Sequence, residues 1–178
     1  MRLLAVLVLG GLGVSLLDRV HVAYGVLVQN DASLFGQAWW VAPVFAVACA
    51  ATVGMYGVLR RRLALPAQPW RPAWLGLAVV LFAAAYAATG PFGASKVALP
   101  AALLLTWLAR VVVRGASRLE VGFALTLAIL GPLGEAAWSQ LGLFRYLAPD
   151  LLGVPIWLGG IYLHAGPLVT EVDAWVAA

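Results

Sequence analysis

Charged side chains are scarce in this sequence. They make up 10% of its 178 residues, whereas 64% of the residues are hydrophobic and the mean hydropathy is +0.99. A soluble domain of this length could not hide so much apolar surface from water. The composition therefore excludes an ordinary soluble enzyme and predicts an all-α integral membrane protein that crosses the bilayer several times.

Cysteine and histidine are almost absent. The single cysteine, Cys49, excludes an internal disulfide and a cysteine metal cluster. The two histidines, His21 and His164, fall in the first and last apolar segments, where packing is the more common role. The sequence contains no nucleotide loop and no nucleophile motif. We therefore expect no cofactor, no metal and no catalytic residues, and we attribute the net charge of +4 to membrane topology rather than to nucleic-acid binding.

Six apolar segments are present, and they predict a single domain built as a six-helix transmembrane bundle. They cover about residues 3–24, 38–59, 73–89, 97–113, 121–143 and 154–170. In the first segment, Asp18 and His21 are three residues apart and share a helix face, so they are placed to pair. We see no internal repeat in the sequence.

The distribution of basic residues predicts the orientation. With both termini in the cytoplasm, eight Lys and Arg residues fall in cytoplasmic segments and three fall outside. Arg110 is expected to extend its charge to the interface from the end of the fourth segment. Arginine outnumbers lysine ten to one, and Ala, Gly, Leu and Val dominate. This usage is typical of GC-rich bacteria, so we expect a bacterial plasma-membrane protein.

Glu135 stands out within the fifth apolar segment, Val121–Leu143. A helix over that segment places Glu135 about 4.5 Å beyond its midpoint at 1.5 Å per residue. An ionised carboxylate at that depth costs about 2.5–3.5 kcal/mol on insertion scales. We therefore expect Glu135 to face the protein interior, protonated or hydrogen-bonded, with Gly131 and Gly134 allowing close helix contact nearby.

A sparse set of polar side chains can reach the interior of this bundle. An apolar cavity with a few such groups is what a lipid needs, because the walls accept hydrocarbon while the polar groups fix a hydroxyl or ester. The alternative is that these groups only bond neighbouring helices together. The predicted lipid-binding residues are Tyr86, Ser95, Thr106, Trp107, Glu135, Trp138 and Gln140.

We expect the cavity to be lined by the third, fourth and fifth segments, with a contribution from the first. A neutral lipid with a small head fits best, with diacylglycerol first and a sterol-like polycycle second. A rival hypothesis is a membrane enzyme of isoprenoid or carotenoid metabolism, in which Glu135 acts as acid–base and Asp18 is its partner. A transporter is disfavoured by the absence of a repeat and of intramembrane charge. A purely structural assembly factor is the remaining alternative.

Several stretches together resemble the Insig family of endoplasmic-reticulum membrane proteins. The residues that carry the resemblance are Ala32–Leu63 (ASLFGQAWWVAPVFAVACAATVGMYGVLRRRL), Gly93–Lys96 (GASK), Gly142–Asp150 (GLFRYLAPD) and Trp157–Gly160 (WLGG). The resemblance implies a six-span regulator with both termini cytosolic and no catalytic activity. Animal members bind oxysterols among their helices and retain the escort protein Scap.

The chain departs from the family at two functional positions. The aspartate needed for the Scap partnership falls at about Gly115, and the sterol-reading glutamine has no counterpart near Val97–Pro100. We therefore expect a bacterial Insig-like protein that binds a neutral membrane lipid and has no Scap-like partner. Its Gly- and Ala-rich faces also suit a homo-oligomer, either a dimer or a trimer.

Overall fold

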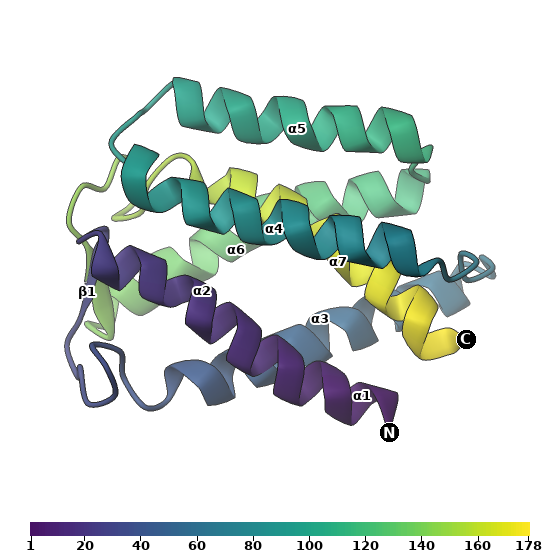
Figure 1. The fold of residues 1–178 in the computed structure, drawn as a ribbon, viewed down its shortest axis with the longest axis horizontal. Helices are drawn as coiled ribbons and strands as arrows, with labels where there is room; N and C mark the ends of the chain where they lie inside the picture. Colours follow the sequence, from purple (N-terminus) through teal and green to yellow (C-terminus); the bar gives the residue numbers. More distant parts are fainter.

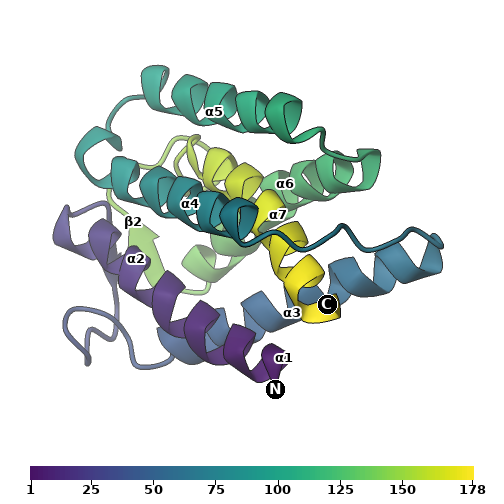
Figure 2. The same ribbon diagram turned by 45° about the vertical axis from the view of Figure 1, so that its right-hand side comes forward.

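A computed structural model describes all 178 residues as a helical bundle with one small two-stranded sheet (Figures 1 and 2). The first helix is continuous over Arg2–Ala23 and contains one π-helical stretch, η1. The elements in order are α1 (Arg2–Ala5), η1 (Val6–Gly10), α2 (Gly11–Ala23), β1 (Leu27–Gln29), α3 (Val41–Arg62), α4 (Pro72–Phe92), α5 (Ala98–Arg114), α6 (Arg118–Gln140), β2 (Phe144–Tyr146) and α7 (Leu158–Ala177).

Four helices are long and apolar enough to cross a membrane: Arg2–Ala23, α3, α4 and α6. The other two differ from them. Helix α5 has 17 residues, and α7 has 20 residues but contains Glu171 and Asp173. The helix in the sixth segment extends beyond residue 170, where we predicted the span to end. The helix continues to Ala177 because the two acids are buried against arginines instead of lying in a polar tail.

Helix α7 forms the centre of the bundle. It packs against α3, α4, α5 and α6, and the ribbon shows it passing between them (Figures 1 and 2). Trp157 and Leu158 at its start are among the most buried side chains. The largest core cluster gathers around this end of α7, with Phe82, Tyr86 and Leu103 among its members. Small residues make this central position possible, since a Cβ added at Gly166 would lie 2.4 Å from the Cβ of Ala124.

The two short strands were not predicted from the sequence. β1 and β2 pair antiparallel, with Val28 opposite Arg145 and Leu27 opposite Tyr146. They lie at the end of the bundle opposite to the two termini (Figure 1). Each strand follows a helix and precedes a tight turn, so together they bridge the loops that leave α2 and α6.

The chain contains an internal structural repeat, which we did not see in the sequence. The unit from Arg2 to Arg62 is matched by the unit from Arg118 to Ala177, while α4 and α5 lie between them in the chain. Equivalent residues are 117 positions apart, as Gly25 is from Gly142. Val28 and Arg145 are themselves equivalent, so the antiparallel ladder pairs the two units symmetrically about its centre.

The turns of the two units agree residue by residue. Gly25 and Gly142 follow the first helix of each unit with φ of 63° and 75°. An isolated bridge, Leu34 to Gln37 or Leu151 to Val154, then closes each turn. In its middle, Phe35 and Leu152 have φ of 53° and 52°, and the glycine after each has φ of 85°. Few side chains are identical between these turns, which explains why the repeat escaped detection in the sequence.

A charged cluster holds the end of the bundle that carries the termini. Arg110 donates to Glu120 at 3.0 Å and to Glu171 at 3.2 Å, and Arg114 donates to Glu171 at 3.0 Å. Arg60 meets Asp173 at 2.7 Å. Arg110 is therefore buried and paired, and the prediction that its charge extends to the interface is wrong.

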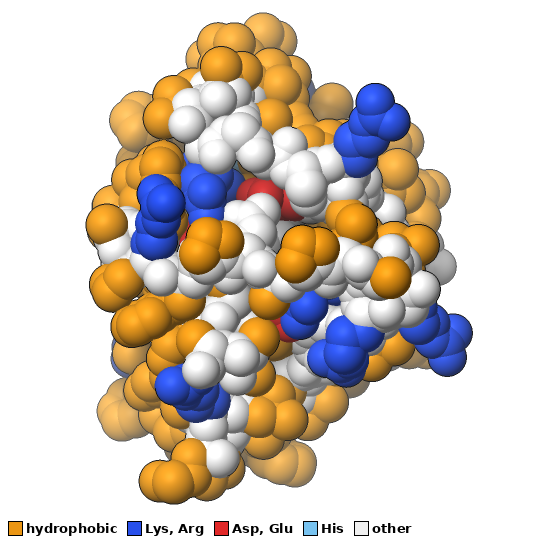
Figure 3. Space-filling view, turned by 90° about the vertical axis from the view of Figure 1, so that its right-hand side faces the viewer, with side chains coloured by type: hydrophobic (Ala, Val, Ile, Leu, Met, Phe, Trp, Pro, Cys, Tyr) orange, Lys and Arg blue, Asp and Glu red, His pale blue; other side chains and the backbone are white.

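The same end displays most of the remaining basic residues. Figure 3 shows Lys and Arg side chains spread over this face, with acidic atoms visible only in recesses between them. Arg2 donates from Nη1 to the backbone oxygen of Trp175 at 2.8 Å, which ties the two ends of the chain together. The residues assigned to one side of the membrane by charge thus lie at one end of the structure.

Candidate functional site

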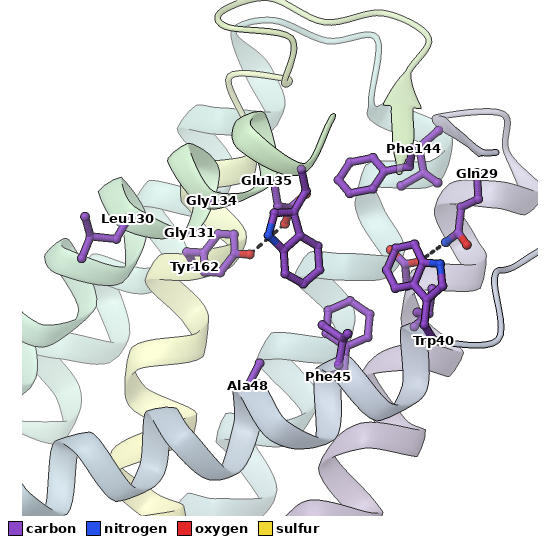
Figure 4. A pocket seen from close by; sticks show the side chains of 15 residues that line it. Gln29, Trp40, Phe45, Ala48, Leu130, Gly131, Gly134, Glu135, Phe144 and Tyr162 are labelled. Atoms are coloured by element: carbon purple, nitrogen blue, oxygen red, sulfur yellow. Dashed lines mark hydrogen bonds between the residues drawn. The ribbon is translucent and has the colours of Figure 1, made fainter. Parts of the chain in front are cut away.

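A cavity of about 270 Å³ lies between α3 and α6, near the strand end of the bundle (Figure 4). Its walls are mostly apolar, and its polar groups lie toward the strand side. The lining residues are Asp18, Leu27, Gln29, Trp40, Val41, Val44, Phe45, Ala48, Leu130, Gly131, Gly134, Glu135, Trp138, Phe144 and Tyr162.

The cavity exists because α3 and α6 separate toward the strand end. At the other end they meet through Tyr56 and Phe123, whose rings lie 5.1 Å apart in an edge contact. Near the strands, the rings of Trp40 and Trp138 lie 6.1 Å apart between centroids. The second and fifth helices thus form the walls, and the first and sixth contribute Asp18 and Tyr162. The fifth and first segments, which we predicted to line a lipid cavity, thus contribute to this one, whereas no residue of the predicted third and fourth segments lines it, and α4 packs against α2 and α7.

Glu135 is a hydrogen-bond acceptor at one side of this cavity. Tyr162 on α7 donates to its Oε1 at 2.8 Å, and Tyr146 on β2 donates to its Oε2. The predicted hydrogen-bonded, inward-facing carboxyl is confirmed, and Glu135 lies nearer the end of its helix than the predicted segment Val121–Leu143 implied. Because α6 ends at Gln140, Glu135 lies five residues, about 7.5 Å, from the end of the helix.

Gly131 and Gly134 play different roles beside Glu135. A Cβ added at Gly131 would lie 2.4 Å from the Tyr162 ring, so the glycine permits close contact with α7 as expected. A Cβ added at Gly134 would meet nothing within 4 Å, because that face of α6 opens into the cavity. Only the first glycine is therefore needed for helix packing.

Asp18 is the second carboxyl group of the cavity. Its Oδ2 accepts hydrogen bonds from the side-chain amides of Gln37 at 3.0 Å and Gln29 at 3.4 Å. Its Oδ1 lies 3.4 Å from Nδ1 of His21, which confirms the expected pairing along the first helix. Asp18 is 6% exposed, and no Lys or Arg lines the cavity. Apart from His21, the donors around the two acids are therefore amides and phenols, and none is a Lys or Arg side chain.

Only two of the predicted binding residues, Glu135 and Trp138, line the cavity. Ser95 lies in the loop before α5, where its Oγ accepts a hydrogen bond from the backbone nitrogen of Ala98. Gln140 is exposed at the last position of α6. The structure brings neither of these two residues to Glu135.

The other three predicted residues belong to the helix packing around α7. Tyr86 stacks on His21 with ring centroids 4.9 Å apart. Thr106 lies 3.1 Å from Nε2 of His164, and Trp107 is buried beside Leu163. These side chains hold helices together, which is the alternative role that the sequence left open.

Several cavity residues were missed from the sequence. Tyr146 and Tyr162 lie 11 and 27 residues after Glu135, so helical spacing could not place them next to it. Gln29 and Phe45 lie on a strand and a helix that only the folded chain brings beside α6. The available signal was the polar and aromatic content of the two loops, which we assigned to turns and to the membrane interface.

A second cleft corresponds to this cavity through the internal repeat. It lies between α2 and α7, and α4 fills it by packing against both helices. The Trp40–Trp138 contact of the open cleft has its counterpart in Trp157 and His21, whose ring centroids are 5.5 Å apart. Tyr86 of α4 covers His21 there. One of two equivalent clefts is therefore filled by protein and the other is not.

Comparisons with known proteins identify the fold. No protein-family model matches the chain, and a sequence comparison with curated proteins finds no match. Two crystal structures of MvINS, a mycobacterial Insig homologue from Mycobacterium vanbaalenii, superpose on it. One covers 97% of this chain and 92% of its own, with a TM-score of 0.84 and 21% identity. The other, a cross-linked trimer of a cysteine variant, covers 99% and 94%, with a TM-score of 0.85 and 20% identity. The chain is therefore a membrane protein with the fold of a bacterial Insig homologue.

Proposed function

We propose that this protein binds a neutral lipid in the cleft between α3 and α6 and has a sensing or regulatory role. The observation that carries the proposal is the open, largely apolar cleft with two carboxyl groups on its polar side. The equivalent cleft is filled by α4, so we expect the open cleft to be filled by a bound molecule. An apolar ligand with a small polar head matches the apolar walls and the few polar groups of this cleft.

The chemistry of the cleft supports a neutral head. No Lys or Arg side chain lines it, so a phosphate or a fatty-acid carboxylate would bring negative charge next to Asp18 and Glu135 without a counter-ion. An alcohol can donate to a carboxyl oxygen at no such cost. Diacylglycerol is the first candidate in a membrane without sterols, and a sterol-like polycycle is the second.

We propose that six helices span a bacterial plasma membrane. Four of them are long and apolar enough by themselves, and α5 and α7 are the other two. The acids of α7 are paired with arginines, which lowers the cost of burying them. The basic end in Figure 3, with both termini, lies in the cytoplasm on the positive-inside rule. The cleft near the strands then opens toward the outer leaflet.

We further propose that the protein forms a homo-oligomer. MvINS has been crystallised as a cross-linked trimer. In this chain, Gly54, Gly76 and Gly122 each have open space where a side chain would be, so neighbouring helices can approach them closely. A trimer is therefore the favoured assembly, and a Scap-like partner is not expected.

The lipid proposal is tested by native mass spectrometry on protein purified in mild detergent. One neutral lipid retained per chain, and lost in both Glu135→Ala and Trp138→Ala, is the expected result. Gln140→Ala is the matched control, because Gln140 lies on the same helix but points away from the cleft. Unchanged retention in both cleft variants would refute the proposal.

The enzyme hypothesis remains a second candidate, because Asp18 is buried and lines the same cavity as Glu135. Two carboxyl groups in one cavity can act as acid and base on an isoprenoid double bond. The likeness to an Insig homologue favours a role without catalysis. Incubation of the purified protein with isoprenoid and carotenoid precursors, followed by product analysis, decides between them. Turnover that is lost in Glu135→Gln would establish the enzyme.

A further inference from the structure

We infer that Asp18 is a second ligand-binding carboxylate, equivalent to Glu135, and that the cleft selects lipids whose head carries two free hydroxyl groups. This inference rests on the proposed lipid-binding function and changes the order of its candidate ligands. It combines three observations: the internal repeat, the hydrogen bonds of the two carboxyl groups, and the composition of the cleft walls.

The repeat places the two acids at equivalent positions. Asp18 and Glu135 are separated by the same 117 residues that separate Gly25 from Gly142. Each lies near the end of the first helix of its unit, before the strand that joins the central ladder. Both side chains line the one open cleft, together with the equivalent pair Leu27 and Phe144. Equivalent residues of both units therefore line the same cleft.

The two acids are also held in the same way. In each unit a strand residue 11 positions after the acid donates to one of its oxygens: Gln29 to Asp18, and Tyr146 to Glu135. Each acid has one further donor, Gln37 or Tyr162. These four donors fix the carboxyl groups in place before any ligand enters, which reduces the ordering cost of binding.

The hydrogen bonds already made by the two acids determine which hydrogen-bonding groups the ligand must carry. Each carboxylate oxygen has two lone-pair sites. Gln29 and Gln37 fill both sites of Oδ2 of Asp18, so its unused acceptor site is on Oδ1, the oxygen beside His21. Each oxygen of Glu135 receives one phenol donor and keeps one site. The unused sites are acceptors, and no Lys or Arg side chain lines the cleft to occupy them. The ligand head must therefore donate hydrogen bonds, and two hydroxyl groups satisfy both acids where one hydroxyl satisfies only one.

The size of the cleft agrees with such a ligand. Its volume of about 270 Å³ is small for a whole lipid, since ligand pockets usually measure about 300–1,000 Å³. It accommodates a glycerol-sized head and the first part of one chain. The rest of the chain passes out between α3 and α6, beside exposed apolar residues such as Val47 and Leu130. Monoacylglycerol-type diols therefore rank ahead of diacylglycerol, which has one hydroxyl.

The test compares three lipids that share one oleoyl-length chain: 1-monooleoylglycerol with two hydroxyls, oleyl alcohol with one, and methyl oleate with none. Retention of each by the detergent-solubilised full chain is measured by native mass spectrometry. We expect the diol to bind about tenfold better than the alcohol, and the alcohol better than the ester. Asp18→Asn and Glu135→Gln should each lower the retention of the diol to that of the alcohol. Asp31→Asn, an exposed acid in the following loop, is the control.

The outcomes separate the inference from the proposal on which it rests. Equal retention of diol and alcohol by the wild-type protein overturns the inference while leaving lipid binding intact, and this arm needs no variant to fold. An unchanged diol preference in a folded Asp18→Asn protein overturns it as well. Retention of none of the three lipids also overturns the inference, whereas the proposed function is decided separately by the lipid that co-purifies with the wild-type protein and by its loss in Glu135→Ala and Trp138→Ala.

Discussion

The two equivalent clefts of this molecule have the same backbone arrangement, but one is filled by a helix and the other is open. Between α2 and α7, α4 inserts, Tyr86 stacks on His21, and Trp157 donates from Nε1 to the backbone oxygen of Gly93 at 2.9 Å. Between α3 and α6 nothing inserts, and Trp40 and Trp138 face an open cavity. The comparison shows that the cavity does not arise from loose packing. It is the position that α4 occupies in the other half of the molecule, and under the proposed function a lipid occupies it here.

The comparison also separates side chains that stabilise the fold from side chains that serve the site. Residues of the filled cleft should contribute to the free energy of unfolding, whereas under the proposed function residues of the open cleft should affect ligand retention. Variants at equivalent positions can therefore be compared directly, since the backbone around each pair is the same.

The largest expected effect comes from the equivalent tryptophans. Trp157→Ala removes a side chain that is 1% exposed and should cost about 3–5 kcal/mol of unfolding free energy. Trp40→Ala, at the open cleft, should lower stability much less and should reduce lipid retention instead. Thermal unfolding of both delipidated variants in the same detergent measures the difference. Equal losses of stability would break the comparison.

The charged cluster should hold the filled cleft closed. Arg110 and Arg114 anchor α5 to α6 and α7, and the Arg114 guanidinium lies 5.0 Å from the ring centroid of Trp74 on α4. Arg110→Ala leaves buried carboxylates without a partner, and breaking a buried pair costs about 3–5 kcal/mol. Hydrogen exchange should then increase in α4 and α5 more than at the α3–α6 cleft. Lys96→Ala, which removes an exposed ion pair, serves as the control.

The two glycines beside Glu135 allow the open cleft to be filled deliberately. Gly134→Leu extends into free space and should displace the lipid with little change in unfolding temperature. Gly131→Leu meets the Tyr162 ring and should destabilise the protein by about 1–3 kcal/mol. Lipid retention and thermal unfolding are measured on both. Full retention in a stable Gly134→Leu protein would show that the lipid lies elsewhere.

The smallest effect concerns a difference between the two turns. Asp150 in the second turn pairs with Lys96 at 2.7 Å and accepts from the backbone nitrogen of Ile156, whereas Ser33 stands at the equivalent position in the first. The hydrogen bond from Lys96, followed by that from Ile156, lowers the pKa of Asp150. Its contribution is therefore present above the ordinary aspartate pKa of about 3.9 and is lost as the pH falls below it. Thermal unfolding between pH 3 and pH 6 should show a small loss at low pH that Asp150→Asn abolishes. An identical pH profile in the variant would contradict it.

The sequence was sufficient for the fold class, because apolar length and the spacing of aromatic and glycine motifs are local properties. It also singled out Glu135 and Trp138, which both line the cavity, since a carboxylate in an apolar helix is conspicuous and Trp138 lies one turn later. The arginines illustrate the limit. Their positions in the sequence indicated an end of the bundle, but only the folded chain shows that Arg60 and Arg110 pair with acids of α7.

The cavity itself could not be predicted, because its walls come from helices far apart in the chain. Thr106 and Trp107 looked equivalent to Trp138 by polarity, yet α5 turns them toward α7. The repeat was hidden because its halves share backbone conformation rather than side chains, as Phe35 and Leu152 show.

The most direct test of the account is to locate the lipid. A photoactivatable monoacyl lipid, bound at one per chain after detergent exchange, is cross-linked and mapped by peptide mass spectrometry. If the lipid binds between α3 and α6, labelling should be saturable around Phe45 and Leu130 and should be competed by excess unlabelled lipid. No such labelling is expected around Trp157, which is buried in the filled cleft. Saturable labelling on the outer face of α5, or none at the α3–α6 cleft, would contradict the claim that this cleft is the binding site.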